Sequence, residues 1–232
     1  MVYDFSLNYN QTFADKHDFT ALFLFRRQQS AKGSAFPRFR EDWVGRVTYN
    51  YDSRYFIDVN GAYNGSEKFG PGYRFDLFPS IALGWTPSNE TFLEKADWVS
   101  KIRGSYGVVG DDNFTGRWKY VSQWGSSGSG YLVPTSNSGQ SPYTFYREAS
   151  VGNPDLQWET AEKYNIGTEF SLFNGLLSGE IDYFAENRSN IVIVGADRSV
   201  PDWFGQTAPD LNACEVEVRG YEVVLASNYT FG

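Results

Sequence analysis

The sequence predicts an all-β protein whose strands form an antiparallel up-and-down sheet, as in a segment of a transmembrane β-barrel. Three observations support this fold class. Apolar and polar residues alternate over stretches of nine or more residues, which is the period of a strand. The connections between these stretches tend to alternate between short and long. Aromatic side chains gather near the ends of the stretches, beside the short turns.

The clearest stretch is a hairpin over residues 42–63. Trp43, Val47 and Tyr49 fall on one face of its first strand, and the pattern restarts after Asp52 and Ser53. Two alternating runs separated by two residues of this kind are typical of a β-hairpin with a tight turn. Each strand is about ten residues long, roughly twice the usual five or six.

Seven further stretches alternate in the same way, so the sequence predicts nine strands. Polar residues lie between the apolar ones on most of them, and no run of 18 apolar residues is present, which excludes a transmembrane helix. Besides the hairpin, the expected strands cover residues 2–10, 18–27, 74–86, 98–107, 158–171, 176–186 and 219–231.

The order of connection lengths favours a membrane barrel over a soluble sandwich. Short and long connections tend to alternate, which places the longest ones, 108–157 and 187–218, at the same end of an up-and-down sheet. Outer-membrane barrels have short periplasmic turns and long extracellular loops, whereas Greek-key crossovers would disrupt such sorting. Alternation alone does not distinguish a membrane barrel from a soluble sandwich, because a soluble antiparallel sheet with one solvated face also alternates apolar and polar residues.

Composition excludes several classes of function. The chain of 232 residues has a net charge of −8 and shows no basic stripe, which argues against nucleic-acid binding. Its mean hydropathy is negative, but lipid-facing and lumen-facing residues cancel in the average over a barrel strand. The single cysteine, Cys214, has no cysteine to pair with, and with the single histidine, His17, it makes a poor metal site. The sequence does not indicate a role for Cys214.

Aromatic residues on the two long loops are the candidate substrate-binding residues. Exposed rings on irregular loops can stack on sugars or on peptide side chains, although they can equally form a small core within the loop. The candidates are Trp118, Trp124, Tyr131 and Trp203. The Gly/Ser stretch at 125–130 within the first loop is typical of a flexible segment.

No catalytic constellation or cofactor motif stands out, so no enzyme activity is predicted. Asp111, Asp112 and Asn113 lack the spacing of a calcium loop and are interpreted as solvated turn residues. Carboxylate pairs for glycoside hydrolysis can be drawn from the 158–171 strand and its approach, but so many acidic residues produce such pairs by chance.

Five collinear blocks resemble the C-terminal half of the barrel in SusC/RagA-type TonB-dependent transporters. They are "DWVGRVTYNYDSRYFIDVNGAYNGSEKF", "RFDLFPSIALGWTPSNETFL", "KIRGSYGVVGDDN", "NPDLQWETAEKYNIGTEFSLFNGLLSGEIDYFAENRSNIV" and "VEVRGYEVVLASNYTFG". The resemblance implies a 22-stranded outer-membrane barrel that imports oligosaccharides or peptides. It also implies a SusD-type surface lipoprotein as a cap and a plug domain driven by the TonB complex.

Residues 1–232 are therefore expected to form about nine or ten strands of such a barrel, in contact with outer-membrane lipid and without the plug domain. Two alternatives remain. One is a soluble β-sandwich that binds carbohydrate through the same loop aromatics, which would fold without detergent. The other is a glycan hydrolase on a β scaffold, which would cleave oligosaccharides.

Overall fold

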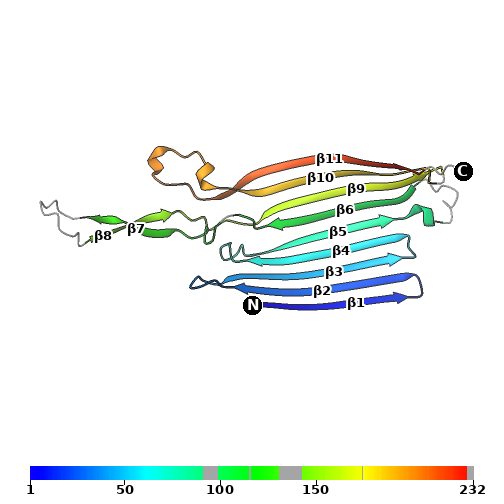
Figure 1. Cartoon of the computed structure of the whole chain (residues 1–232), viewed down its shortest axis with the longest axis horizontal. Helices are drawn as coiled ribbons and strands as arrows, with labels where there is room; N and C mark the ends of the chain where they lie inside the picture. Colours follow the sequence, from blue (N-terminus) through cyan, green and yellow to red (C-terminus); the bar gives the residue numbers. More distant parts are fainter. Residues whose placement is uncertain (91–98, 115, 131–142, 174, 229–232) are drawn as a thin grey trace.

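A computed structural model describes residues 1–90, 99–114, 116–130, 143–173 and 175–228. Within this part of the chain, nine strands form one antiparallel sheet, in the order β1-β2-β3-β4-β5-β6-β9-β10-β11, and β7 and β8 form a separate hairpin (Figure 1). The strands are β1 (Val2–Phe13), β2 (His17–Ser30), β3 (Arg38–Tyr51), β4 (Tyr55–Ser66), β5 (Phe75–Trp85), β6 (Val99–Asp111), β7 (Gln123–Gly130), β8 (Tyr143–Ser150), β9 (Glu159–Leu172), β10 (Leu177–Ile193) and β11 (Leu211–Ser227).

This arrangement confirms the predicted up-and-down sheet. Each strand pairs with its neighbour in the chain, except that the β7–β8 hairpin is inserted between β6 and β9. The sheet is a single layer in Figure 1, with the β7–β8 hairpin projecting beyond one end. It is therefore not a sandwich. Within the described residues, no helix has the length and apolar character needed to cross a membrane.

The two longest connections lie at the same end of the sheet, as the sequence indicates, although 86–98 at the opposite end is longer than 31–37 and 67–74. One end holds the connections 14–16, 52–54, 86–98 and 173–176, and the other holds 31–37, 67–74, 112–158 and 194–210. We call the second end the loop end. The turn at Asp52 and Ser53 has positive φ angles of 52° and 54°. Arg54 N donates to Tyr51 O at 2.8 Å. These are the features of a type I′ turn, whose twist matches that of the flanking strands.

The two faces of the sheet differ in chemistry. Strand register places aromatic and aliphatic residues opposite each other on one side, for example Tyr49 with Ile57, and Tyr106 with Tyr164. Large side chains remain exposed on this apolar face, including Ile166 at 65% and Tyr221 at 77%. Burying such a surface requires another apolar phase or partner, because folded soluble proteins rarely leave a large apolar patch in water.

The polar face has ion pairs that connect different strands, including β6 with β10 across the intervening β9. Arg103 on β6 donates from Nη2 to Asp182 Oδ2 at 2.7 Å. It also contacts Glu169 and Glu180, so one guanidinium faces three carboxylates. Arg46 pairs with Asp58 between β3 and β4. His17, at the short-turn end, contacts Tyr49 Oη through Nδ1 at 2.7 Å and so has a structural partner.

The main differences from the expected boundaries lie in the two long loops and in the last strand. The first long loop contains the β7–β8 hairpin, so the Gly/Ser stretch at 125–130 lies in a strand instead of a flexible segment. The second long loop shrinks from 187–218 to 194–210, because β10 and β11 continue to pair as far as Ile193 with Leu211. Pairing uses the backbone, so strands continue where side-chain alternation fades. β11 also begins earlier than the expected 219 and ends at Ser227.

Candidate functional site

The described buried core lies at the loop end. Phe69 and Leu156 are fully buried, and Phe78 and Trp158 complete the cluster. The Phe69 and Trp158 rings lie with centroids 5.0 Å apart, and the Trp158 indole nitrogen donates to Arg74 O at 3.3 Å. This core joins the 67–74 connection to the segment that enters β9. It therefore gives the loop end a packed base, which we call the loop core.

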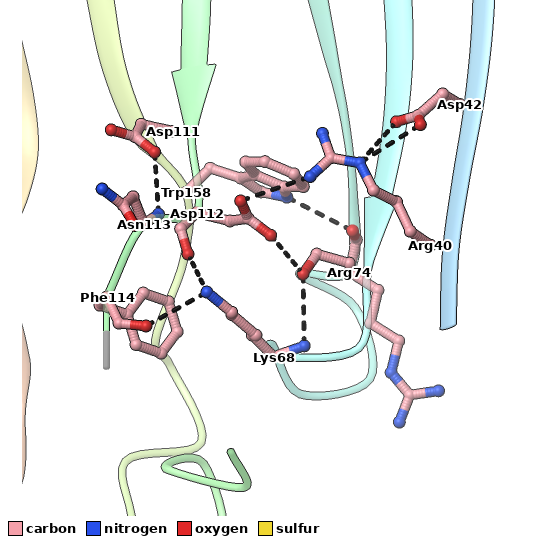
Figure 2. A network of polar contacts seen from close by, with 10 residues as sticks. Arg40, Asp42, Lys68, Arg74, Asp111, Asp112, Asn113, Phe114 and Trp158 are labelled. Carbon is pink, nitrogen blue, oxygen red and sulfur yellow. Dashed lines mark hydrogen bonds and ion pairs between the residues drawn. The ribbon is translucent and has the colours of Figure 1, made fainter. Parts of the chain in front are cut away.

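A polar network surrounds the loop core (Figure 2). Ser66 Oγ donates to Asp112 Oδ2 at 2.7 Å, and Arg40 pairs with the same carboxylate at 3.5 Å. Lys68 Nζ donates to the backbone oxygens of Asp112 at 2.6 Å and Phe114 at 3.1 Å. These contacts hold the start of the first long loop against the 67–74 connection. They also supply the Asp112 carboxylate with a hydroxyl donor and an arginine partner.

The two long loops contact each other through Asp210. Its buried carboxylate pairs with Lys119 Nζ at 3.1 Å and accepts a hydrogen bond from Gly195 N at 2.8 Å. Asn153 Nδ2 donates to the backbone oxygen of Asp210 at 2.9 Å. Residues from both loops thus converge on one acidic side chain, which places the loops against each other at their bases.

A cavity of about 460 Å³ lies at the loop end, between the 31–37 connection, the edge of β3 to β5 and the start of the first long loop; we call it the rim pocket. Arg117 reaches across it and donates to the backbone oxygens of Phe36 and Pro37, both at 2.8 Å. Its Nη2 also pairs with Glu67 at 2.9 Å. The Trp118 ring packs edge-on against Phe36 and lies 4.8 Å from the Arg117 guanidinium.

The structure separates the four predicted substrate-binding residues. Trp118 lines the rim pocket, is 38% exposed and has a positive φ of 56°. Trp124 on β7 and Trp203 in the short 3-10 helix η3 (Asp202–Phe204) are 69% and 85% exposed. Among the described residues, no ring contact joins these three side chains. Tyr131 lies outside the described residues.

Sequence patterns did not single out Arg117, Asp210 or Phe36. Each acts through a partner at least 10 residues away in the chain, such as Lys119 for Asp210 and Arg117 for Phe36. Contacts of this kind have no periodicity or motif that a single sequence displays. Phe145 and Tyr146 on β8 were also missed, and they add exposed rings to the hairpin that carries Trp124.

These features define a class of protein. A single-layered antiparallel sheet with long strands, one apolar face, one polar face and long loops at one end is the wall of an outer-membrane-type β-barrel. The family model described as "TonB dependent receptor-like, beta-barrel" matches residues 2–232. The chain belongs to this family.

Individual relatives agree with this assignment and confirm the resemblance to SusC/RagA-type transporters. TonB-dependent receptor P39 of Formosa agariphila is 26% identical over 97% of this chain and 24% of its own length. TonB-dependent receptor SusC of Bacteroides thetaiotaomicron is 30% identical over 61% of this chain and 14% of its own length. The structure of the RagAB peptide transporter matches 99% of this chain and 28% of its own, with a TM-score of 0.77 at 20% identity.

The chain thus spans about a quarter or less of the length of the curated relatives that it matches. It corresponds to part of a barrel wall, in agreement with the nine-stranded sheet of the described residues.

Proposed function

We propose that this chain is part of the wall of an outer-membrane importer that takes up oligosaccharides or peptides. The observation that carries the proposal is the two-faced sheet: its exposed apolar side suits lipid, and its polar side suits a wet lumen. Membership in the TonB-dependent receptor-like barrel family supports the same assignment. The loop end is then extracellular.

The proposed mechanism needs no bond chemistry in this chain. The 22-stranded barrel that the resemblance implies is wide enough to need a plug that prevents leakage. Opening the plug requires energy, which the TonB complex supplies from the inner membrane. The carboxylates around Arg103 on the polar face then line the lumen. The mechanism assigns gating to a plug domain and transport specificity to the lumen and the loop end.

We also propose a SusD-type surface lipoprotein as the partner at the loop end. The β7–β8 hairpin projects beyond the sheet (Figure 1) and exposes Trp124 and Tyr146, each at 69%. Exposed aromatic side chains are typical of the centre of protein interfaces and of sugar-binding sites. RagAB, whose structure this sheet resembles, is a peptide transporter, which supports peptides as one substrate class.

The test uses the full-length gene product that carries this chain, in its host. We expect it in the outer-membrane fraction, with external protease cutting within 112–158 and 194–210. A deletion strain should lose uptake of one class among labelled oligosaccharides and peptides, and a protonophore should abolish that uptake in the wild type. Recovery of the protein in a soluble fraction would refute the proposal.

Single alanine variants at Trp124 and Trp203 test the loop rings. Each ring is largely exposed, so we expect normal amounts of protein in the membrane. Loss of co-purified lipoprotein would assign the ring to the partner interface, and loss of uptake with the lipoprotein retained would assign it to substrate. Wild-type behaviour of both variants would remove these rings from the proposed site.

A further inference from the structure

The rim pocket continues the apolar face of the sheet by one row of residues. Phe25, Trp43 and Tyr63 lie opposite each other in one aromatic row near the loop end. Two residues further along each strand, on the same face, register places Arg27, Glu41 and Gly65. All three line the rim pocket. The pocket therefore opens on the outer side of the proposed barrel wall, not on its lumen.

Its height on that wall matches the boundary of a bilayer. From Tyr51 to Glu41, β3 extends about 34 Å along the strand at about 3.4 Å per residue. At the strand tilt of about 35–45° in such barrels, this length corresponds to a height of about 24–28 Å. The apolar band of outer-membrane barrels is about 25 Å tall and ends in an aromatic girdle. The charged row of Arg27 and Glu41 thus begins where lipid headgroups begin.

The chemistry of the pocket suits a phosphate group. Four arginines and two glutamates line it, in a chain whose formal net charge is −8. Arg27 forms an ion pair with Glu41 through Nε at 3.8 Å, longer than a hydrogen bond, and its side chain is 57% exposed. Arg74 donates from Nε to Phe69 O at 3.2 Å, and its guanidinium projects away from the polar network (Figure 2). Among the described residues, neither arginine has an acceptor for its Nη atoms.

Apolar surface accompanies these free donors. Phe36, Phe39 and Phe75 line the same pocket, and the Phe75 ring stacks on Tyr63 with centroids 5.2 Å apart. Gly65 allows this arrangement, because a β-carbon there would collide with the Phe75 ring. Arg117 is a positioning residue, since its bonds to the backbone of the 31–37 connection hold Phe36 over the pocket.

We propose that the rim pocket binds a phosphorylated lipid of the outer leaflet, with Arg27 and Arg74 on the phosphate. Guanidinium groups bind phosphate oxygens through paired, charge-assisted hydrogen bonds. The aromatic wall lies against the apolar part of the same molecule. The proposal rests on the proposed function, because it requires the apolar face to lie in the membrane.

The test compares two adjacent arginines on opposite faces. Arg26 and Arg27 have side chains 52% and 57% exposed, but Arg26 pairs with Asp4 on the polar face. The full-length protein is purified in mild detergent as wild type, Arg27→Gln/Arg74→Gln and Arg26→Gln. Binding is measured to vesicles of phosphatidylcholine with and without lipopolysaccharide, and retained lipid is quantified by native mass spectrometry.

We expect the double variant to bind lipopolysaccharide about tenfold more weakly, because several charge-assisted hydrogen bonds are lost. Arg26→Gln should bind as wild type. Equal retention by all three proteins would overturn the proposal, as would competition by inorganic phosphate at equal concentration, which would indicate a free anion as the ligand. Loss of a co-purified lipoprotein with unchanged lipid would also overturn it, in favour of a protein contact.

The two proposals fail separately. If the protein resides in the outer membrane and imports substrate while its arginine variants keep their lipid, only the lipid site is wrong. If the full-length protein is absent from the outer membrane, the proposed function fails and the lipid site fails with it.

Discussion

Lys119 and Asp210 form an ion pair of 3.1 Å that joins the first long loop to the second. The two residues are distant in the chain, yet Asp210 is buried and also accepts a hydrogen bond from Gly195 N. A buried carboxylate requires such partners, because its desolvation is costly. The two long loops are thus coupled at their bases.

Asp210→Ala should loosen the 194–210 loop. It leaves the Gly195 amide and the Lys119 ammonium without their acceptor, at a local cost of about 1–3 kcal/mol. Hydrogen exchange should become faster in 194–210 and in the segment around Asn153, with strands β9 to β11 unchanged. Lys32→Gln, an exposed lysine in the 31–37 connection, serves as the control. Unchanged exchange in Asp210→Ala would show that the loops are held by other contacts.

Trp158→Ala should destabilise the loop end. The indole is buried against Phe69 and Phe78 and donates a hydrogen bond, so its removal should cost about 3–5 kcal/mol. The midpoint of heat unfolding in detergent should fall. Trp124→Ala removes the same side chain at a position that is 69% exposed, so it should change stability by about 0.5 kcal/mol or less. Similar midpoints for the two variants would contradict the loop core.

Ile166→Arg should reduce insertion into the outer membrane. Ile166 lies on the apolar face of β9 and is 65% exposed, so the arginine would face lipid at a cost of about 2–4 kcal/mol near the midplane. Its neighbour Asn165 has the opposite orientation and pairs with Ser105. Asn165→Arg should therefore insert normally. The amount of each variant protein is measured in the outer-membrane fraction. Equal amounts of the two variants would show that the apolar and polar faces of the sheet are wrongly assigned.

Arg103→Gln should destabilise the sheet more than Arg46→Gln. Arg103 serves Glu169, Glu180 and the buried Asp182, whereas Arg46 serves Asp58 alone with an exposed guanidinium. Removing one partner of a buried charge costs about 3–5 kcal/mol, but removing one from an exposed pair costs about 1 kcal/mol or less. Unfolding in denaturant compares the two variants, and equal losses would mean that the Asp182 site is well solvated.

Part of this structure follows from sequence alone because strand alternation is local. The nine strands of the main sheet were predicted from their period of two, and the turn at Asp52 and Ser53 from its flanking runs. The hairpin β7–β8 was missed, since Gly and Ser in its first strand carry no alternating signal. Its partner β8 has the rings, but their pattern was assigned to a loop.

The sequence by itself determined the fold class, the two faces of the sheet and the family, because these depend on the order of side chains along each strand. Only the tertiary structure decided which loop residues meet: Trp118 lies with Arg117 and Phe36 in the rim pocket, while Trp124 and Trp203 remain exposed. The physical reason is that these contacts join segments distant in the chain. Their pairing depends on sheet register and loop packing, and neither leaves a repeating pattern in the sequence.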